Sequence, residues 1–378
     1  MKFIHLSDLH LGKRVHEFSM HEEQKAILDQ ILTIIDSEKP DGVLIAGDIY
    51  DKSVPPAEAV MLFDDFLVNL SNRALQVFII SGNHDSPERI AFGSRIMSEG
   101  GIHLSPVYDG NIQPFTMSDG NGSVNIYMLP FIKPAHIRRY FADEEIVTYT
   151  DAVRVAIKNM NVDPSVRSIL VTHQFVTGAS RSDSEEISVG GSDNVDASVF
   201  DGFDYVALGH IHSPQICKFQ HIRYCGTPLK YSFSEMHDVK SLTVVELNET
   251  DTVIRAVPLH PIHDMSELRG SFEKLTDPDF YTKSPQTDHY LRIVLTDEND
   301  IPDAIGRLRL IYKNLMNLEY DNTRTRKNTI VSGAIQTETK SAFTLFSEFY
   351  ELRNNAPMSA EQIDYMRALI EKIEEDTI

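Results

Sequence analysis

Five polar clusters in the sequence carry side chains that bind metal ions, and each cluster follows a short apolar run. The side chains are carboxylates, imidazoles and one amide, with no cysteine among them. Such oxygen and nitrogen ligands suit manganese, iron or zinc better than an iron–sulfur cluster or a thiolate zinc site. The candidate metal ligands are Asp8, His10, Asp48, Asn83, His173, His210 and His212.

This ligand set is too large for one catalytic metal ion, because such an ion keeps open coordination positions. It suits two ions roughly 3.5–4 Å apart, with one carboxylate bridging them. Two adjacent cations polarise a phosphoryl group and lower the pKa of a shared water until the water is a nucleophile near neutral pH. The set therefore predicts phosphoester chemistry at a two-metal centre.

Each cluster alone has an ordinary alternative. Asp-x-His after a strand is more often a turn, because Asp caps turns readily. Gly82-Asn83-His84-Asp85 is also typical of a left-handed turn, and a lone His173 is more often a structural histidine. Gly209-His210-Ile211-His212 is the most specific cluster, since residues two apart project from one side of an extended segment. The occurrence of all five clusters at strand ends favours a shared site.

The apolar runs before the clusters predict the elements that position them. Short continuous apolar runs are typical of strands buried on both faces, and amphipathic helices over 21–36 and 57–70 separate the first three. Strands that alternate with helices predict an α/β sheet, in which ligands bind beyond the carboxyl ends of the strands. The predicted strands are 2–6, 43–46, 77–80, 169–172 and 205–208.

The remaining chain predicts further elements and a second unit. A hairpin is expected over 107–130, with its turn at 119–122, and the polar segment 178–196 is expected to be a loop or a lid. After strands in 239–259, the predicted second unit comprises strand 290–295, helix 302–317 and strand 318–332. A polar tether over 333–341 then leads to two terminal helices, 342–353 and 359–375.

Composition limits the class of protein. The length of 378 residues suggests two or three domains, and no apolar run approaches the roughly 18 residues that span a membrane. Only two cysteines are present, Cys217 and Cys225, so a reducing cytoplasm is expected. A net charge of −21 argues against a loose, nonspecific nucleic-acid coat. It leaves room for a nucleic-acid enzyme whose positive charge is concentrated in metals and one basic patch.

The five clusters resemble, in order and spacing, the motifs of the calcineurin-like metallophosphoesterase superfamily. The whole chain resembles, more narrowly, the SbcD family of bacterial DNA nuclease subunits. Three further stretches carry that narrower resemblance: 50–56, 188–191 with 194–196, and 226–235. The resemblance implies a β-sandwich flanked by helices, with a small α+β capping domain and a C-terminal helix-loop-helix. The implied domains are the nuclease domain 1–265, the capping and DNA-binding domain 266–332, the tether 333–341 and the helix-loop-helix 342–378.

The resemblance also implies residue roles. One metal would be held by Asp8, His10, Asp48 and His212, and the other by Asp48, Asn83, His173 and His210, with manganese as the expected metal. His84 would face the scissile phosphate and stabilise the transition state or protonate the leaving oxygen. Asp51 follows the phosphatase-like pattern of a carboxylate that orients this histidine.

Two weaker signals concern partners. A basic set in the second unit, together with Lys230, is expected to contact the DNA backbone, although solvated cations on a helix face are the common alternative. The cations are Lys230, Arg307, Arg309, Lys313, Arg324, Arg326 and Lys327. The terminal helices carry apolar stripes, which pack either on the chain's own core or on a partner, and Ser359 with Gln362 predicts a capping box.

The expected function is that of the nuclease subunit of an SbcCD-type complex, which hydrolyses DNA phosphodiester bonds as an exonuclease and endonuclease. Its expected partners are DNA and a coiled-coil ATPase of SbcC type that the terminal helices bind, with a homodimer inside a heterotetramer. A phosphatase or small-molecule phosphodiesterase of the same fold is the nearest alternative. A non-catalytic scaffold is a third, against which the full ligand set and His84 argue.

Overall fold

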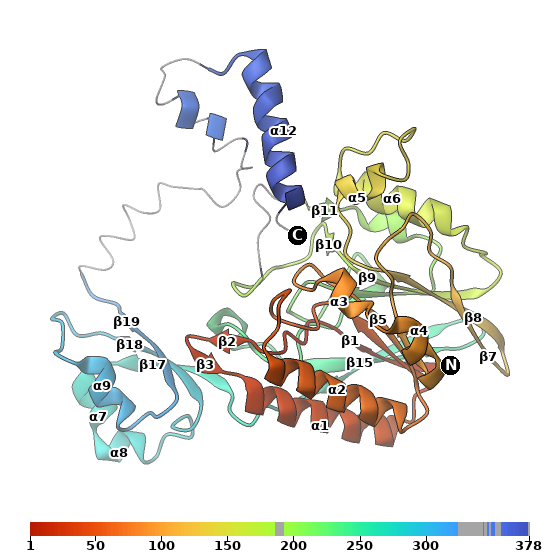
Figure 1. Cartoon of the computed structure of the whole chain (residues 1–378). Coiled ribbons are helices and arrows are strands. Elements are labelled where there is room, and N and C mark those ends of the chain that lie inside the picture. Colours follow the sequence, from red (N-terminus) through yellow and green to blue (C-terminus); the bar gives the residue numbers. More distant parts are fainter. Residues whose placement is uncertain (186–192, 324–342, 344–345, 348, 352–356, 377–378) are drawn as a thin grey trace.

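The computed structural model describes residues 1–185, 193–323, 343, 346–347, 349–351 and 357–376. Two six-stranded sheets lie face to face, and helices cover the outer face of each sheet (Figure 1). The sandwich flanked by helices confirms the predicted fold class. No helix in the described ranges combines the length and apolarity needed to cross a membrane.

The first sheet has the strand order β16-β15-β1-β4-β5-β6. Its strands β1, β4, β5 and β6 are parallel, whereas β15 and β16 extend it in antiparallel fashion. The central strands are continuous apolar runs because both faces of the covered sheet are buried. The bounds are β1 (Lys2–Leu6), β4 (Gly42–Ala46), β5 (Gln76–Ile80), β6 (Ile102–Leu104), β15 (Ser241–Leu247) and β16 (Thr252–Pro258).

The second sheet has the order β13-β14-β12-β9-β8-β7, with parallel pairing from β8 through β14 and an antiparallel strand at each edge. Asp119 pairs with Gly122 at the end of the β7–β8 hairpin, which confirms the predicted turn. The bounds are β7 (Phe115–Asp119), β8 (Gly122–Leu129), β9 (Arg167–His173), β12 (Tyr205–Gly209), β13 (Gln215–Cys217) and β14 (Phe219–Tyr224).

An apolar core fills the space between the two sheets. Alternate residues of each strand point into it, so Phe3 of β1 belongs to this layer while Ile4 belongs to the outer one. A buried polar pair crosses the layer, since Nδ1 of His5 lies 2.8 Å from the Tyr205 hydroxyl. Burial lowers the pKa of His5 to about 3, so the pair is neutral. The pair therefore links β1 of the first sheet to β12 of the second.

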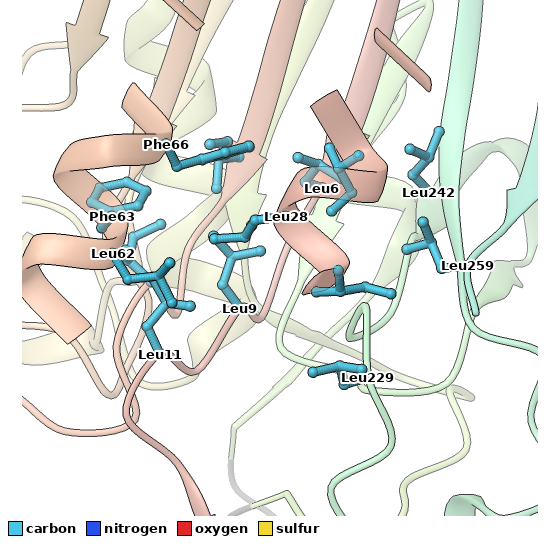
Figure 2. Close-up of a cluster of buried hydrophobic side chains, with 14 of the residues drawn as sticks. Leu6, Leu9, Leu11, Leu28, Leu62, Phe63, Phe66, Leu229, Leu242 and Leu259 are labelled. Carbon is cyan, nitrogen blue, oxygen red and sulfur yellow. The ribbon is translucent and has the colours of Figure 1, made fainter. Parts of the chain in front are cut away.

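Helices α1 (His21–Glu38) and α2 (Ala57–Ser71) cover the first sheet, which confirms both predicted helices. Figure 2 shows leucine and phenylalanine side chains of this layer, including Leu28 of α1 and Phe63 of α2. Helix α6 (Tyr149–Met160) covers the second sheet. The shorter elements are β2 (Arg14–Val15), β3 (Phe18–Ser19), α3 (Pro87–Ile90), α4 (Ser94–Met97), η1 (Ser98–Gly100), α5 (Pro134–Arg138), β10 (Phe175–Val176), β11 (Asn194–Val195), η2 (Ala197–Phe200) and η3 (Phe233–Glu235).

A smaller unit follows, built on the parallel strands β17 (Met265–Gly270), β18 (Tyr290–Leu295) and β19 (Leu315–Tyr320). Met265, Tyr290 and Met316 join the core around α1, so the unit packs on the first sheet's layer. Its helices are α7 (Phe272–Thr276), α8 (Pro278–Tyr281) and α9 (Ala304–Arg309).

The predicted helix 302–317 is wrong in its length. Helix α9 ends at Arg309, and the next strand begins at Leu315 instead of residue 318. The apolar spacing of Leu308, Tyr312 and Leu315 fits a helix, but Leu315 pairs with Leu291 of β18. Pairing with a neighbouring strand therefore overrides the local periodicity.

The terminal segment contains α12 (Ala360–Asp376), close to the predicted second helix. The backbone N–H of Gln362 donates to Ser359 Oγ, and the Gln362 side chain accepts from the Ser359 N–H, which confirms the capping box. Described residues of the predicted first helix, 343, 346–347 and 349–351, are helical. The tether 333–341, Ala342 and segment 188–191 lie outside the described residues.

Candidate metal centre

The seven predicted ligands meet where the carboxyl ends of strands from both sheets come together. Asp8 and His10 follow β1, Asp48 follows β4 and Asn83 follows β5, while His173 ends β9 and His210 and His212 follow β12. All except the half-buried Asn83 are buried. The two sheets therefore contribute their polar ends to a single cluster, as expected for ligand sites in open α/β sheets.

One group of ligands consists of Asp8, His10 and His212. Their metal-binding atoms all lie within 4.8 Å of one another. The Nε2 atoms of His10 and His212 face each other at 3.1 Å, and His10 Nε2 lies 3.7 Å from Asp48 Oδ2. Two atoms that each bind one cation at about 2.1 Å and at right angles are roughly 3.0 Å apart. The spacing of these two nitrogens fits ligands of one ion.

A second group lies on the other side of Asp48. Asn83 Oδ1 is 3.0 Å from His173 Nε2 and 2.9 Å from His210 Nδ1. His173 Nε2 is in turn 3.4 Å from Asp48 Oδ2. Asp48 thus approaches a histidine of each group with the same oxygen, which is the place of a bridging carboxylate. The described residues fit a two-metal centre.

The backbone bends sharply at the ligands. Asp8, His10, Asp48 and His210 have φ of 53°, 45°, 49° and 102°, in the left-handed region that side-chain-bearing residues rarely adopt. Strain of this kind persists only where the surroundings over-determine it, and it gathers at functional sites. The turns point successive side chains into one cluster instead of continuing each strand.

Two glycines allow the loops to approach closely. A Cβ atom on Gly82 would lie 2.1 Å from Asp48 Oδ1, and one on Gly209 would lie 1.9 Å from the Ala46 carbonyl oxygen. Both distances are far below any real carbon contact. The glycines of the Gly-Asn-His-Asp and Gly-His-x-His clusters are therefore required by space, since neither has a positive φ.

The buried charges oppose one another. Burial, followed by the charge of Asp48, raises the pKa of Asp8 to about 7. Burial has the same effect on Asp48, but the charges of His173 and His84 outweigh it and hold the Asp48 pKa well below its usual range. Burial lowers the pKa of His173, yet Asp48 and Asp8 outweigh burial and raise it to about 9. Asp48 is therefore the anionic centre of the cluster.

The sequence patterns did not single out Asp85, although it is the last residue of the Gly-Asn-His-Asp motif. Its carboxylate accepts hydrogen bonds from the backbone N–H groups of Ile49 and Tyr50 after β4 and of Gly82 after β5. One buried side chain thus ties together the two loops that carry Asp48 and Asn83. The motif placed it near the ligands, but only the fold shows which loops it joins.

His84 lies beside the bridging carboxylate. Its backbone N–H donates to Asp48 Oδ1 at 2.9 Å, and its Nε2 lies 3.9 Å from Asp48 Oδ2. Nδ1 of the ring is 3.0 Å from the backbone carbonyl oxygen of Asp51, to which it donates. The Asp51 carboxylate accepts from Lys13 Nζ at 2.6 Å. The main-chain carbonyl of Asp51 thus holds the imidazole of His84, and its carboxylate, the predicted orienting group, pairs with Lys13.

The predicted DNA contacts are spread over different surroundings. Lys230 Nζ donates to Asp264 Oδ1 and to the Met236 carbonyl, both at 2.8 Å, so it joins two segments of the protein. In the small unit, Arg307, Arg309 and Lys313 are exposed, and Arg309 also donates to the Leu315 carbonyl. Arg324, Arg326 and Lys327 lie outside the described residues. Both cysteines are buried free thiols.

Sequence comparisons agree with this geometry. Residues 1–214 match the family model of calcineurin-like phosphoesterases, and residues 261–354 match a model described as the type 5 capsule protein repressor C-terminal domain. The SbcD component of the SbcCD nuclease of Staphylococcus epidermidis is 29% identical over 378 residues, 98% of each chain. This relative, with the two models, confirms the resemblance to SbcD nuclease subunits.

Solved structures were also matched. A dimetal phosphatase from Danio rerio has 12% identity and a TM-score of 0.40, covering 68% of this chain and 96% of its own. A protein of Thermus thermophilus has 11% identity and a TM-score of 0.40, covering 68% of this chain and 98% of its own. The family model spans more than half of the present sequence, up to the last of the predicted ligands. The chain therefore belongs to the calcineurin-like phosphoesterase family.

Proposed function

We propose that the chain is the nuclease subunit of an SbcCD-type complex and hydrolyses DNA phosphodiester bonds with two divalent metal ions, most suitably manganese. The proposed activities are exonuclease action on duplex ends and endonuclease action on single strands and hairpins. The observation that carries the proposal is the position of Asp48, whose carboxylate lies between the two groups of candidate ligands with His84 alongside.

The proposed ligand sets divide at Asp48. Asp8, His10, Asp48 and His212 hold one cation, and Asp48, Asn83, His173 and His210 hold the other. When bound, the cations would polarise the phosphoryl group and lower the pKa of a shared water to near neutral pH. Burial restrains most of these side chains, and His173 is also held by the hydrogen bond from its Nδ1 to the Ala46 carbonyl, which preorganises the site for binding.

His84 is proposed to act on the substrate. Its Nδ1 is bonded to the Asp51 carbonyl, so Nε2 is the ring atom that faces the Asp48 side of the cluster. As imidazolium, it donates a proton from Nε2 to the leaving oxygen or stabilises the charge that develops there. The backbone N–H of the same residue supports the bridging carboxylate.

The terminal helices are proposed to bind a coiled-coil ATPase of SbcC type. A cavity of about 290 Å³ lies between the described helical residues and α12, with mostly apolar walls. Its lining residues are Phe346, Tyr350, Met358, Glu361, Gln362, Tyr365 and Met366. The name of the staphylococcal relative, which makes it one component of a nuclease complex, supports a protein partner.

A homodimer is also proposed. Large apolar side chains on or beside α2, α3 and α4 are exposed, with 83% of Phe92 and 78% of Ile96 accessible. Val60, Met61 and Val68 of α2 are exposed as well. Exposed apolar side chains on this scale are typical of protein interfaces, and a second copy of the chain is the proposed occupant.

The test uses the purified full-length chain with three substrates: end-labelled duplex DNA, a DNA hairpin and p-nitrophenyl phosphate. We expect manganese-dependent fragments from both DNAs, abolished by a chelator and absent in Asp48→Ala. Hydrolysis of the monoester alone would support the phosphatase alternative instead. Cleavage of DNA by metal-free protein would contradict the two-metal proposal.

A further inference from the structure

The two metal-ligand groups differ in how their histidines are held. His173 donates from Nδ1 to the carbonyl oxygen of Ala46 at 2.8 Å, so a rigid strand of the other sheet orients it. His212 has a side chain in the same role, because Ser184 Oγ lies 2.5 Å from its Nδ1. Ser184 belongs to the segment after β10 and not to either sheet. One ligand is therefore held by core structure and the other by a loop residue.

Ser184 is itself held by a buried ion pair. Its hydroxyl bonds Oε1 of Glu235, and Oε2 of the same carboxylate accepts from Lys240 Nζ at 2.5 Å. Glu235 and Lys240 are 0% and 3% exposed. A buried carboxylate with a buried ammonium partner stays ionised and only accepts hydrogen bonds. The serine hydroxyl must therefore donate its proton to Glu235.

That direction fixes the proton on His212. Since the Ser184 hydrogen points to Glu235, Ser184 Oγ can only accept from His212, and Nδ1 must carry the ring proton. The neutral ring then has no proton on Nε2, the atom 3.1 Å from His10 Nε2. A histidine binds a metal ion through an unprotonated ring nitrogen. A hydrogen bond to its other ring nitrogen, such as the one from His212 to Ser184, fixes the tautomer and the orientation of the ring.

The backbone of His212 is held by two side chains next to Ser184 and Glu235. Glu185 Oε1 accepts from the His212 N–H at 2.7 Å, and Lys240 Nζ donates to the His212 carbonyl at 2.9 Å. Glu185 also accepts from the backbone N–H of Ser182 at 2.9 Å. Residues 182–185 therefore contact both the ring and the main chain of this one ligand.

We propose that Ser184, fixed by the Glu235–Lys240 pair, is a positioning residue that presets His212 for metal binding. The cation held by Asp8, His10 and His212 then depends on segment 182–185, whereas the cation held with His173 does not. This inference rests on the two-metal centre of the proposed function. It predicts that the two metal sites respond differently to substitution, because His173 is held by the Ala46 carbonyl and His212 by Ser184.

The test is calorimetric titration of Mn²⁺ into the metal-free, full-length protein. Wild type is expected to bind two equivalents. Ser184→Ala is expected to weaken one class by about 10–100-fold, the usual effect of removing such an outer contact, and to leave the other class unchanged. Ser184→Thr keeps the hydroxyl and should restore the lost affinity. Ser180→Ala is the matched control, because this exposed serine lies just before segment 182–185.

His212→Ala identifies the affected class, because it must abolish the class that Ser184→Ala weakens. Unchanged binding in Ser184→Ala, or equal weakening of both classes, would overturn the inference. Failure of Ser184→Thr to restore the affinity would also contradict the proposed role of the Ser184 hydroxyl in orienting His212. If wild type binds fewer than two equivalents, the two-metal centre itself fails, and that outcome is separate from the effect of Ser184.

Discussion

Replacing His84 separates chemistry from metal binding. The contact that supports the bridging carboxylate is the backbone N–H of His84, 2.9 Å from Asp48 Oδ1, and an alanine retains it. The imidazole lies further away, with Nε2 3.9 Å from Asp48 Oδ2. His84→Ala should therefore keep both metal ions and bind DNA nearly as wild type does.

The expected loss lies in the rate of cleavage. A general acid or a donor to the transition state contributes about 10²–10⁴-fold, or about 2.7–5.4 kcal/mol of activation free energy. Asp51→Asn is the informative comparison, because the carbonyl oxygen that holds the imidazole belongs to the main chain and survives the substitution. It removes the ion pair with Lys13 but keeps the imidazole and its main-chain partner, so the loss of rate should be smaller than in His84→Ala.

Single-turnover cleavage of labelled duplex DNA, with metal content measured on the same preparations, tests this reasoning. We expect two metals in wild type and both variants, a rate reduced at least about 10²-fold in His84→Ala, and a small change in Asp51→Asn. A ring nitrogen of His84 also lies within 4.8 Å of ligand atoms of His10 and Asp48. Binding of only one metal ion by the His84→Ala protein is therefore the decisive contrary result. That outcome would move His84 into the ligand set.

Three further predictions concern other parts of the molecule. Asp48→Ala removes the shared carboxylate, so metal content and cleavage should both be lost while far-UV circular dichroism stays native; a folded variant that still degrades DNA would refute the two-metal centre. Deleting residues 341–378 should abolish co-purification with the ATPase partner but retain manganese-dependent cleavage, and loss of folding would instead assign the helices to the chain's own core. Phe92→Ser should turn the proposed dimer into a monomer in light scattering, with Leu310→Ser as control because Leu310 is equally exposed, at 83%, but lies in the small unit.

The clustering of the candidate ligands could be predicted from the sequence, because its signal is local. Each follows an apolar strand, and the carboxyl ends of neighbouring strands must meet at one edge. The support of His212 could not be predicted in this way, since Ser184, Glu235 and Lys240 come together only through tertiary packing. Helix 302–317 failed for a related reason, because pairing of Leu315 with β18 is a nonlocal contact.

The packing of the two sheets brings the members of each ligand group together, because each group draws side chains from both sheets. Two bonds cross between the sheets at the centre: His173 Nδ1 to the Ala46 carbonyl at 2.8 Å, and the His210 N–H to Asp8 Oδ1 at 3.0 Å. Gly209 lets the backbone at the end of β12 come against Ala46, where any side chain would collide. Ligands from β1 and β4 thereby meet ligands from β9 and β12 at a distance that the inter-sheet core maintains. A change in that core should therefore alter the metal centre without touching a ligand.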